Sequence, residues 1–430
     1  MSRNPISIAG AWITTLSVCA FVTYLVMDQL GLLASPYAGL FGFMVVPAFF
    51  ALGLALIPVG IWVEGRRRRA GHAAWRWPAI DLGRGRTRAI LGAVAALTVV
   101  NIAIVAVASV GAIHYSESNA FCGQVCHVPM EPQFTAHRLS PHSRTRCVDC
   151  HVTPTASGFL TAKLNGTRQL YGLVTNTYRR PIPSPRDRIP VPTATCERCH
   201  APIEPDREIK RTFREHKDNE RSTEIVTALM VYSGRSHWHA RPGVVVEYVA
   251  TDKTLATIPY VRVTEAGQST EYFAESVTAP PAGQPVRRMD CLDCHNRPAH
   301  TLASTPASAV DRAIVRGEIS TRVPFVRSQM VDALSEEHPA GMDASQAVAD
   351  RLAGVFGAAT PEARQAVQAA QRLYRENVFP RMKITWGTYT NQLFHVDDGG
   401  CFRCHDDTHT AKGDPAKKIR NDCELCHKEQ

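Results

Sequence analysis

A cysteine pair followed at once by a histidine recurs six times in this chain of 430 residues and limits what the chain can fold into. Five motifs have two residues between their cysteines, and the first has three. Together the motifs use twelve of the 13 cysteines. They are Cys122-Gly-Gln-Val-Cys126-His127, Cys147-Val-Asp-Cys150-His151, Cys196-Glu-Arg-Cys199-His200, Cys291-Leu-Asp-Cys294-His295, Cys401-Phe-Arg-Cys404-His405 and Cys423-Glu-Leu-Cys426-His427.

This motif is the attachment signature of c-type haem. The two thiols can form thioether bonds to the porphyrin vinyl groups, and the adjacent imidazole can ligate the iron. Zinc ribbons and disulfides also use paired cysteines, but neither requires a histidine after every second cysteine. The sequence therefore predicts six covalently bound haem c groups at sites 1 to 6, numbered in chain order. Their motif histidines, His127, His151, His200, His295, His405 and His427, are predicted iron ligands.

Three long segments, residues 8–27, 38–63 and 89–113, contain no charged residue. Each is long enough to cross the hydrocarbon core of about 30 Å as a helix. The first could instead be the apolar region of a cleaved signal peptide, but a second segment follows it almost immediately. We expect three transmembrane helices.

The charges between the second and third segments predict the orientation. This loop contains eight arginines, at positions 66–69, 76, 84, 86 and 88, and only two acidic residues, Glu64 and Asp81. By the positive-inside rule the loop and the N-terminus are cytoplasmic, so the haem motifs lie on the periplasmic or other outer side of the cytoplasmic (inner) membrane. Because this loop carries much of the net charge of +9, the basic balance is no evidence for a nucleic-acid partner, and none is expected.

The fold class that we expect is a membrane-anchored multihaem cytochrome c, with three transmembrane helices and a mostly α or irregular, haem-packed domain. Residues 1–113 form the anchor, 114–200 hold sites 1 to 3, 201–290 are a β-rich insert, and 291–430 are helical with sites 4 to 6. A small β-hairpin is predicted over residues 243–264. Helices are predicted to begin after Asp343 and after Thr360, where a capping residue precedes a helical pattern.

Each iron needs a second axial ligand to carry electrons with little reorganisation, and His or Met usually supplies it. Residues close to a motif are the first choice, which favours His142, His300, His395 and His409. If side chains alternate around Trp238, His237 and His239 face one side, and we favour His239 with His237 as its substitute. His137, His216 and His338 stay open between ligands and ordinary exposed histidines. Met130, three residues after His127, either ligates haem 1 or packs against the porphyrin.

Residues 89–200 resemble the NapC/NirT/NrfH family of membrane-anchored multihaem quinol dehydrogenases. An apolar helix leads into Phe121-Cys-Gly-Gln-Val-Cys-His-Val-Pro-Met130, followed by Ser140-Pro-His142 and Cys147-Val-Asp-Cys-His151. The resemblance implies that Met130 marks the haem beside the quinol site and that His142 ligates another haem. The family usually has four haems and one span, so this chain looks like an extended subgroup.

The resemblance also implies a quinol site. The family uses a Lys and, six or seven residues later, an Asp at this site. Lys163 matches the Lys, but Gln169 stands in place of the Asp. A Gln can hydrogen-bond a quinol hydroxyl but cannot accept its proton. We expect menaquinol or ubiquinol to bind near haem 1 at Lys163 and Gln169, with His114 and Tyr115 at the end of the third span.

The leading interpretation is a quinol-oxidising protein that draws on the membrane quinol pool and passes electrons through its haems to a periplasmic redox protein or reductase. One alternative is an electron-conduit subunit of a larger membrane complex without its own quinol site. A third is a terminal reductase, in which one iron other than that of haem 1 keeps an open position for substrate.

Overall fold

A computed structural model of the chain describes residues 5–29, 41–70, 83–153, 155–183, 195–200, 207–339, 342–357, 359–395 and 398–429. Arg76, Asp81 and the first residues of the expected second span, 38–40, lie outside these ranges. The chain forms two compact units, Met1–His127 and Val128–Gln430, which are described separately.

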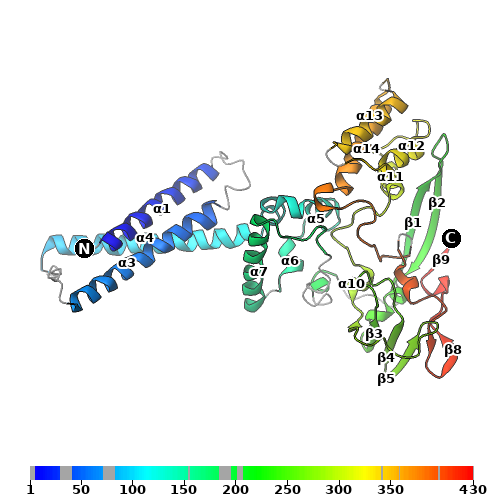
Figure 1. Cartoon of the computed structure of the whole chain (residues 1–430), viewed down its shortest axis with the longest axis horizontal. Helices are drawn as coiled ribbons and strands as arrows, with labels where there is room; N and C mark the ends of the chain where they lie inside the picture. Colours follow the sequence, from blue (N-terminus) through cyan, green and yellow to red (C-terminus); the bar gives the residue numbers. More distant parts are fainter. Residues whose placement is uncertain are drawn as a thin grey trace. The chain divides into compact units, whose positions relative to one another are not determined.

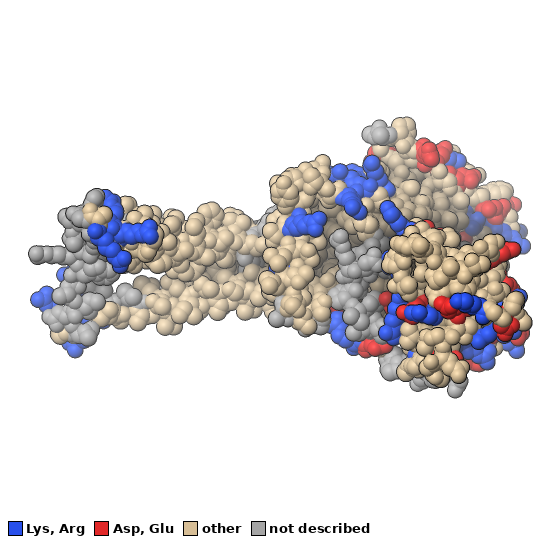
Figure 2. All heavy atoms as spheres, turned by 60° about the horizontal axis from the view of Figure 1, so that its bottom comes forward, with Lys and Arg blue, Asp and Glu red and all other residues tan. Residues whose placement is uncertain are grey.

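The first unit is built from three long helices, α1 (Pro5–Gln29), α3 (Val46–Arg69) and α4 (Gly85–Ser116). Short π-helical turns, η1 (Phe41–Val45) and η2 (Phe121–Val125), precede α3 and follow α4. All three helices are long and apolar enough to cross a membrane, over Pro5–Met27, Val46–Arg67 and Gly85–Ser116, and within the described residues these candidates agree with the three predicted segments. In Figure 2 the helices of this unit carry no charge along most of their length, and Lys and Arg gather at one end.

Small residues set the distance between α1 and α3. A Cβ atom added at Gly53 would lie 2.7 Å from the backbone nitrogen of Thr14, and one added at Gly10 would lie 2.7 Å from the carbonyl oxygen of Gly53. The hydroxyl of Ser7 donates a hydrogen bond to the carbonyl oxygen of Ile57 at 3.0 Å. Close backbone approach at small residues, with a polar contact across it, is typical of helices packed in a membrane.

The second unit begins with three helices near the haem motifs: α5 (His127–Leu139), α6 (Cys147–His151) and α7 (Ala156–Val174). A later group of helices, α11 (Pro306–Val315), α12 (Val326–Ser335), α13 (Ala344–Phe356) and α14 (Pro361–Asn377), lies together in Figure 1. This group has its own apolar core, in which Val310, Val326, Met330, Val348 and Leu352 are completely buried. We call this group, which lies between sites 4 and 5 in the sequence, the helical subdomain.

The two predicted helix starts are confirmed. The side chain of Asp343 accepts a hydrogen bond from the backbone N–H of Gln346 at 3.1 Å, and α13 begins at the next residue. Thr360 caps α14 in the same way, through the N–H of Ala363 at 3.2 Å, with Pro361 at the first helical position. Both caps satisfy backbone donors that have no partner within the helix.

Two antiparallel sheets complete the second unit. A three-stranded sheet has the order β1 (Glu208–His216), β2 (Glu224–Tyr232), β9 (His427–Glu429). A six-stranded sheet has the order β6 (Val286–Arg288), β3 (Val244–Val249), β4 (Tyr260–Glu265), β5 (Gln268–Phe273), β7 (Thr410–Ala411), β8 (Asp414–Lys418). The β structure is thus more extensive than one small hairpin, because two strands that follow site 5 and one that begins at the histidine of site 6 join strands from residues 208–288.

Candidate haem-binding sites

Local hydrogen bonds close a short turn at the haem motifs of sites 3 to 6. In three sites the N–H of the motif histidine donates to the carbonyl oxygen of the first cysteine at 2.8–3.0 Å: His200 to Cys196, His295 to Cys291 and His405 to Cys401. At sites 4 and 6 the preceding aspartate caps the turn: Asp290 accepts from the N–H of Leu292 at 2.7 Å, and Asp422 from that of Glu424 at 3.0 Å. These bonds are local and repeat from site to site.

Site 1 accommodates its additional residue in a wider turn. Cys122 lies in the π-helical turn η2, Cys126 follows it directly, and His127 begins α5. A π-helical turn holds one residue more than an α-helical turn, so a spacing of three residues can still place both thiols on one side. Met130 is three residues after His127 on α5, which puts both side chains on one face of the helix. Either side chain could therefore serve as the ligand at this site.

Five motif histidines each face a second histidine at nearly the same separation. The ring centres are 6.0–6.2 Å apart in all five pairs: His151 with His300, His200 with His142, His295 with His237, His405 with His239, and His427 with His395. The interplanar angles range from 11° to 90°. A constant separation with variable ring rotation indicates that the distance between the rings is constrained and their rotation is not.

The separation fits one iron held between two imidazoles. An imidazole–metal bond is about 2 Å long and the ligating nitrogen is about 1 Å from the ring centre, so two imidazoles on opposite faces of one iron have centres about 6 Å apart. The two imidazoles could rotate independently about the common axis through the iron. The residues at sites 2 to 6 therefore fit a haem with two histidine ligands.

Hydrogen bonds orient several of these rings. His142, His237, His300 and His405 each have Nδ1 within 2.7–3.1 Å of a backbone carbonyl oxygen, from Pro298, Ser233, Gln133 and Arg420 respectively. A histidine that donates through Nδ1 keeps Nε2 free for a metal, and the bond fixes both the tautomer and the ring orientation. The rings are thus held ready for ligation through Nε2.

His237 and His239 face different motif histidines, although only Trp238 lies between them in the chain. Trp238–Ala240 forms a 3-10 turn, η4, which follows the helical turn α9 (Ser233–Ser236). The expectation of an extended segment with alternating side chains is therefore wrong, and His237 pairs with His295 while His239 pairs with His405. The only signal in the sequence was the pair of histidines on either side of Trp238, and it did not show that each of them faces a different site.

His409 has both ring nitrogens engaged by the protein. Nδ1 lies 2.9 Å from a carboxylate oxygen of Asp406, and Nε2 lies 2.6 Å from the carbonyl oxygen of Ile258. The side chain is almost completely buried. This geometry leaves no nitrogen for iron and disfavours the ligand role predicted from its closeness to site 5.

The three histidines left open in the sequence differ from one another. His216 is buried, with Nδ1 2.9 Å from a carboxylate oxygen of Asp311, and belongs to an ion-pair network. His137 is buried beside site 2, with its ring centre 6.2 Å from that of His300. It is thus a second imidazole at ligand distance from His300. His338 packs edge-on against Tyr374 in the helical subdomain.

The cysteines show that sites 2 to 6 lie in chain order. The thiols of Cys196 and Cys291 are in hydrogen-bonding contact, which joins site 3 to site 4. Three further pairs of thiols lie near enough to affect each other's protonation: Cys150 and Cys199 for sites 2 and 3, Cys294 and Cys404 for sites 4 and 5, and Cys401 and Cys426 for sites 5 and 6. Each of sites 2 to 5 thus has the next site in the chain as a neighbour, and we call this series of neighbours the row.

Arg403 links two neighbours in this row. It is buried within the motif of site 5, where Nε donates to the carbonyl oxygen of Gly400 at 2.7 Å. Its Nη2 donates to the carbonyl oxygen of Asp293, in the motif of site 4, at 2.6 Å, and Nη1 donates to that of Leu255 at 3.0 Å. A guanidinium group held by three carbonyl oxygens places a positive charge between the two motifs.

The predicted quinol-site residues belong to different units. His114 and Tyr115 lie near the C-terminal end of α4 in the first unit, while Lys163 and Gln169 lie on α7 in the second. Lys163 is half-buried, with Nζ 4.9 Å from the ring centre of Phe159, whereas Gln169 is exposed. Six residues of α-helix turn through about 600°, so Lys163 and Gln169 leave the helix about 120° apart. They do not share one face of α7.

The geometry of the described residues gives no support to the zinc and disulfide alternatives. All thirteen cysteines fall within the described ranges, and each is a free thiol. Over the same ranges, no three His, Cys, Asp or Glu side chains converge as a metal-ion site would require. The histidines come in pairs, which suits haem better than a tetrahedral zinc site.

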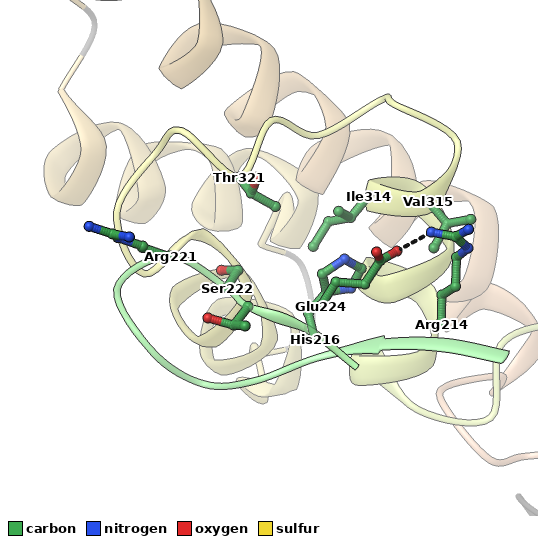
Figure 3. Close-up of a pocket in the computed structure, with 9 residues that line it drawn as sticks. Arg214, His216, Arg221, Ser222, Glu224, Ile314, Val315 and Thr321 are labelled. Carbon is green, nitrogen blue, oxygen red and sulfur yellow. Dashed lines mark hydrogen bonds and ion pairs between the residues drawn. The ribbon is translucent and has the colours of Figure 1, made fainter. Parts of the chain in front are cut away.

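A polar pocket of about 340 Å³ lies between the β1–β2 hairpin and α11 (Figure 3). Its walls include Arg214, which is paired with Glu224 at 2.7 Å, together with His216 and Ile314. In Figure 3 the side chain of Arg221 points away from these residues. No lining residue belongs to a haem motif or faces a motif histidine, so the pocket is distinct from the haem sites.

Comparison with known proteins extends these observations. Residues 85–182 match the family model described as the NapC/NirT cytochrome c family, N-terminal region. The chain is also similar to the cytochrome c-type protein ImcH of Geobacter sulfurreducens: the two are 33% identical, and the alignment covers 99% of this chain and 87% of that protein. No solved structure matches the chain. The family match contains α4, sites 1 and 2, and α7, and the similarity to ImcH continues across all six motifs.

Proposed function

Because the chain belongs to the NapC/NirT-related family of c-type cytochromes, it is a membrane-anchored electron-transfer protein with covalently bound haem c, and we propose that it oxidises quinol. Oxidation releases two protons and two electrons from each quinol. The bound haems supply one-electron redox chemistry at their irons. The proposal includes six haems, the outer face of the cytoplasmic membrane as the place of reaction, and a periplasmic or other extracytoplasmic acceptor.

The row of sites 2 to 6 carries this proposal. Four of its members have the attachment cysteines of the next site close by, and all five have two facing imidazoles about 6 Å apart. Matched ligands and close neighbours favour transfer of electrons rather than binding of a substrate at iron. We propose the five facing pairs as the axial ligands of haems 2 to 6, with Met130 or His127 at haem 1.

Lys163 is the residue of this chain that we propose to contact quinol. It lies within the family match, on a helix that follows sites 1 and 2. An ammonium group donates hydrogen bonds and favours negative charge beside it, so it can hold a quinol oxygen as the hydroxyl proton leaves. Neither Gln169 nor Leu170, six and seven residues later, can accept that proton. The proton acceptor is then a group other than the side chain at these two positions.

The absence of an acid at these positions favours the second candidate, an electron-conduit subunit that receives electrons from a partner in the membrane. The terminal-reductase alternative is less well supported. Every motif histidine of sites 2 to 6 faces a second imidazole at ligand distance, and an iron with two histidine ligands has no position for a substrate.

Anaerobic reduction by quinol separates the two remaining functions. The oxidised, detergent-purified holoprotein is mixed with a menaquinol analogue, and the absorbance of reduced c-type haem is followed. We expect rapid reduction, slowed about tenfold or more in Lys163→Ala and unchanged in Arg168→Ala, which removes an exposed cation from the same helix. If quinol gives no reduction while dithionite reduces the protein normally, the chain is a conduit.

A further inference from the structure

Helix α7 carries a stripe of large apolar side chains that the protein does not cover. Leu160, Leu164, Tyr171 and Val174 follow one another at intervals of four, seven and three residues, which places them on one face of the helix. Their exposed fractions are 59%, 65%, 69% and 79%. A single exposed leucine needs no explanation, but four large apolar residues on one helix face mark an interaction surface.

Part of the other side of α7, toward the two ends of the helix, packs against the protein. Phe159, Ala162 and Leu173 are half-buried, as are Gly158 and Gly172. They lie roughly opposite the stripe on the helical wheel, whereas Asn165, Gly166 and Gln169, on the same side in the middle of the helix, are exposed. The helix therefore presents apolar side chains both to the protein and away from it, as expected of a helix that separates a protein from a second apolar medium.

The charges around α7 indicate which medium covers the stripe. Between residues 132 and 183 Asp149 is the only acidic residue, and it is paired with Arg146 at 2.7 Å. The same stretch contains seven cations: Arg138, Arg144, Arg146, Lys163, Arg168, Arg179 and Arg180. An excess of cations in the sequence segment that contains this apolar helix face suits the phosphates of anionic lipids.

We propose that α7 lies in the plane of the membrane surface, with the stripe at the boundary between lipid headgroups and acyl chains. The helix begins about 40 residues after α4, the last candidate span, so it belongs to the part of the chain that follows the membrane directly. Tyr171, the second most exposed residue of the stripe, combines an apolar ring with a hydroxyl and is of a type enriched at this boundary. The inference does not depend on quinol oxidation.

Lipid photo-crosslinking tests this placement on the intact holoprotein. The protein is placed in nanodiscs that contain phosphatidylglycerol and a phospholipid with a diazirine in its acyl chain, and adducts are mapped by peptide mass spectrometry after irradiation. We expect adducts on residues 160–174 as well as on the three anchor helices. Helix α14, whose apolar residues are buried in the helical subdomain, should carry none.

Two variants of neighbouring residues sharpen the test. Leu164→Asn should lower the adducts on α7 by about threefold or more and leave those on the anchor unchanged, because it weakens the apolar face. Asn165→Ser, the next residue and about 100° round the helix, should leave both unchanged. Adducts confined to the anchor helices would overturn the proposal. So would a change of the haem absorbance spectrum in Leu164→Asn with no adducts on α7, because a haem would then cover the stripe.

Discussion

At the scale of single residues, hydrogen bonds separate histidines that can ligate iron from one that cannot. His300 donates to one carbonyl oxygen and keeps Nε2 available, whereas both nitrogens of His409 are engaged. The two residues have similar positions in sequence, a few residues after a motif histidine. The groups around each ring distinguish the two histidines, and the spacing of the motifs does not predict those groups.

This distinction predicts different effects of the same substitution. His300→Ala should remove one axial ligand, so that about one haem in six becomes high-spin in the absorbance and electron paramagnetic resonance spectra. His409→Ala should leave all haems low-spin and lower stability by about 2–4 kcal/mol, because it removes a buried ring and the donor that reaches the carbonyl oxygen of Ile258. A high-spin haem in His409→Ala would contradict the structural role given to this residue.

Arg403 gives a second prediction at this scale. Its positive charge lies between the motifs of sites 4 and 5, where it disfavours the additional charge of an oxidised iron. Arg403→Gln should therefore lower the reduction potential of one or two haems, whereas Arg403→Lys, which keeps the charge, should shift it less. A potentiometric titration of the holoprotein measures both. Equal shifts in the two variants would show that the hydrogen bonds matter and the charge does not.

At the scale of elements, a buried ion-pair network joins the β1–β2 turn to the helical subdomain. Asp311 on α11 accepts from Arg327 on α12 at 2.9–3.0 Å and lies 2.9 Å from Nδ1 of His216 at the end of β1. Arg327 also donates to Asp218 in the turn at 2.6 Å. The hydrogen bond to Asp311 is the main cause of the raised pKa of Arg327.

Breaking this network should loosen the subdomain. Asp311→Ala leaves the Arg327 guanidinium with one carboxylate instead of two, and removing one partner of a buried pair costs about 3–5 kcal/mol. Hydrogen exchange should accelerate in residues 208–232 and 306–335. Glu336→Ala removes the partner of Arg351 in a more exposed ion pair and serves as the control. It should lower the free energy of unfolding by no more than about 1 kcal/mol and leave hydrogen exchange in these segments unchanged.

The contact between α1 and α3 gives the second prediction for elements. Gly53→Leu places a side chain where the backbone of Thr14 lies 2.7 Å away, so α1 must move. Overpacking of this kind costs about 1–3 kcal/mol or more. The thermal stability of the protein in detergent should fall, with faster exchange in residues 5–29. Gly92→Leu on α4 is the matched control, because a Cβ atom at Gly92 meets nothing within 4 Å, and equal losses in both variants would argue against the contact.

At the scale of the whole molecule, the second unit is organised around the row of sites. Segments from other parts of the sequence meet the motif histidines: His237 and His239 face those of sites 4 and 5, and His395 faces that of site 6. The strand β9 of site 6 also joins β2. The sheets therefore hold the C-terminal sites against a scaffold formed earlier in the chain.

The row predicts what removal of a middle site does. Cys291→Ala with Cys294→Ala should abolish attachment at site 4 and separate sites 5 and 6 from sites 2 and 3. We expect quinol to reduce only about three of the five remaining haems quickly, those of sites 1 to 3, while dithionite reduces all of them. Removal of site 6 by Cys423→Ala with Cys426→Ala should leave all five remaining haems rapidly reducible. Rapid and complete reduction without site 4 would mean that electrons bypass the row.

The sequence by itself determined the features that depend on neighbouring residues. Attachment of haem needs two thiols and an imidazole on one turn, and the motifs contain all three. The anchor follows from uncharged segments long enough to span a membrane, and the starts of α13 and α14 follow from capping side chains next to them. All of these interactions span no more than a few residues, so spacing and residue type were sufficient to predict them.

Tertiary structure decided which distant groups meet. The pairing of His300 with His151, the double role of His237 and His239, the order of sites 2 to 6 and the burial of His409 all depend on segments far apart in the chain. Closeness in sequence suggested His409 as a ligand, but a carboxylate and a carbonyl oxygen from two segments satisfy its ring. An imidazole ligates iron only where the fold leaves one nitrogen free and aimed at the metal, and the packing of the whole unit sets both conditions.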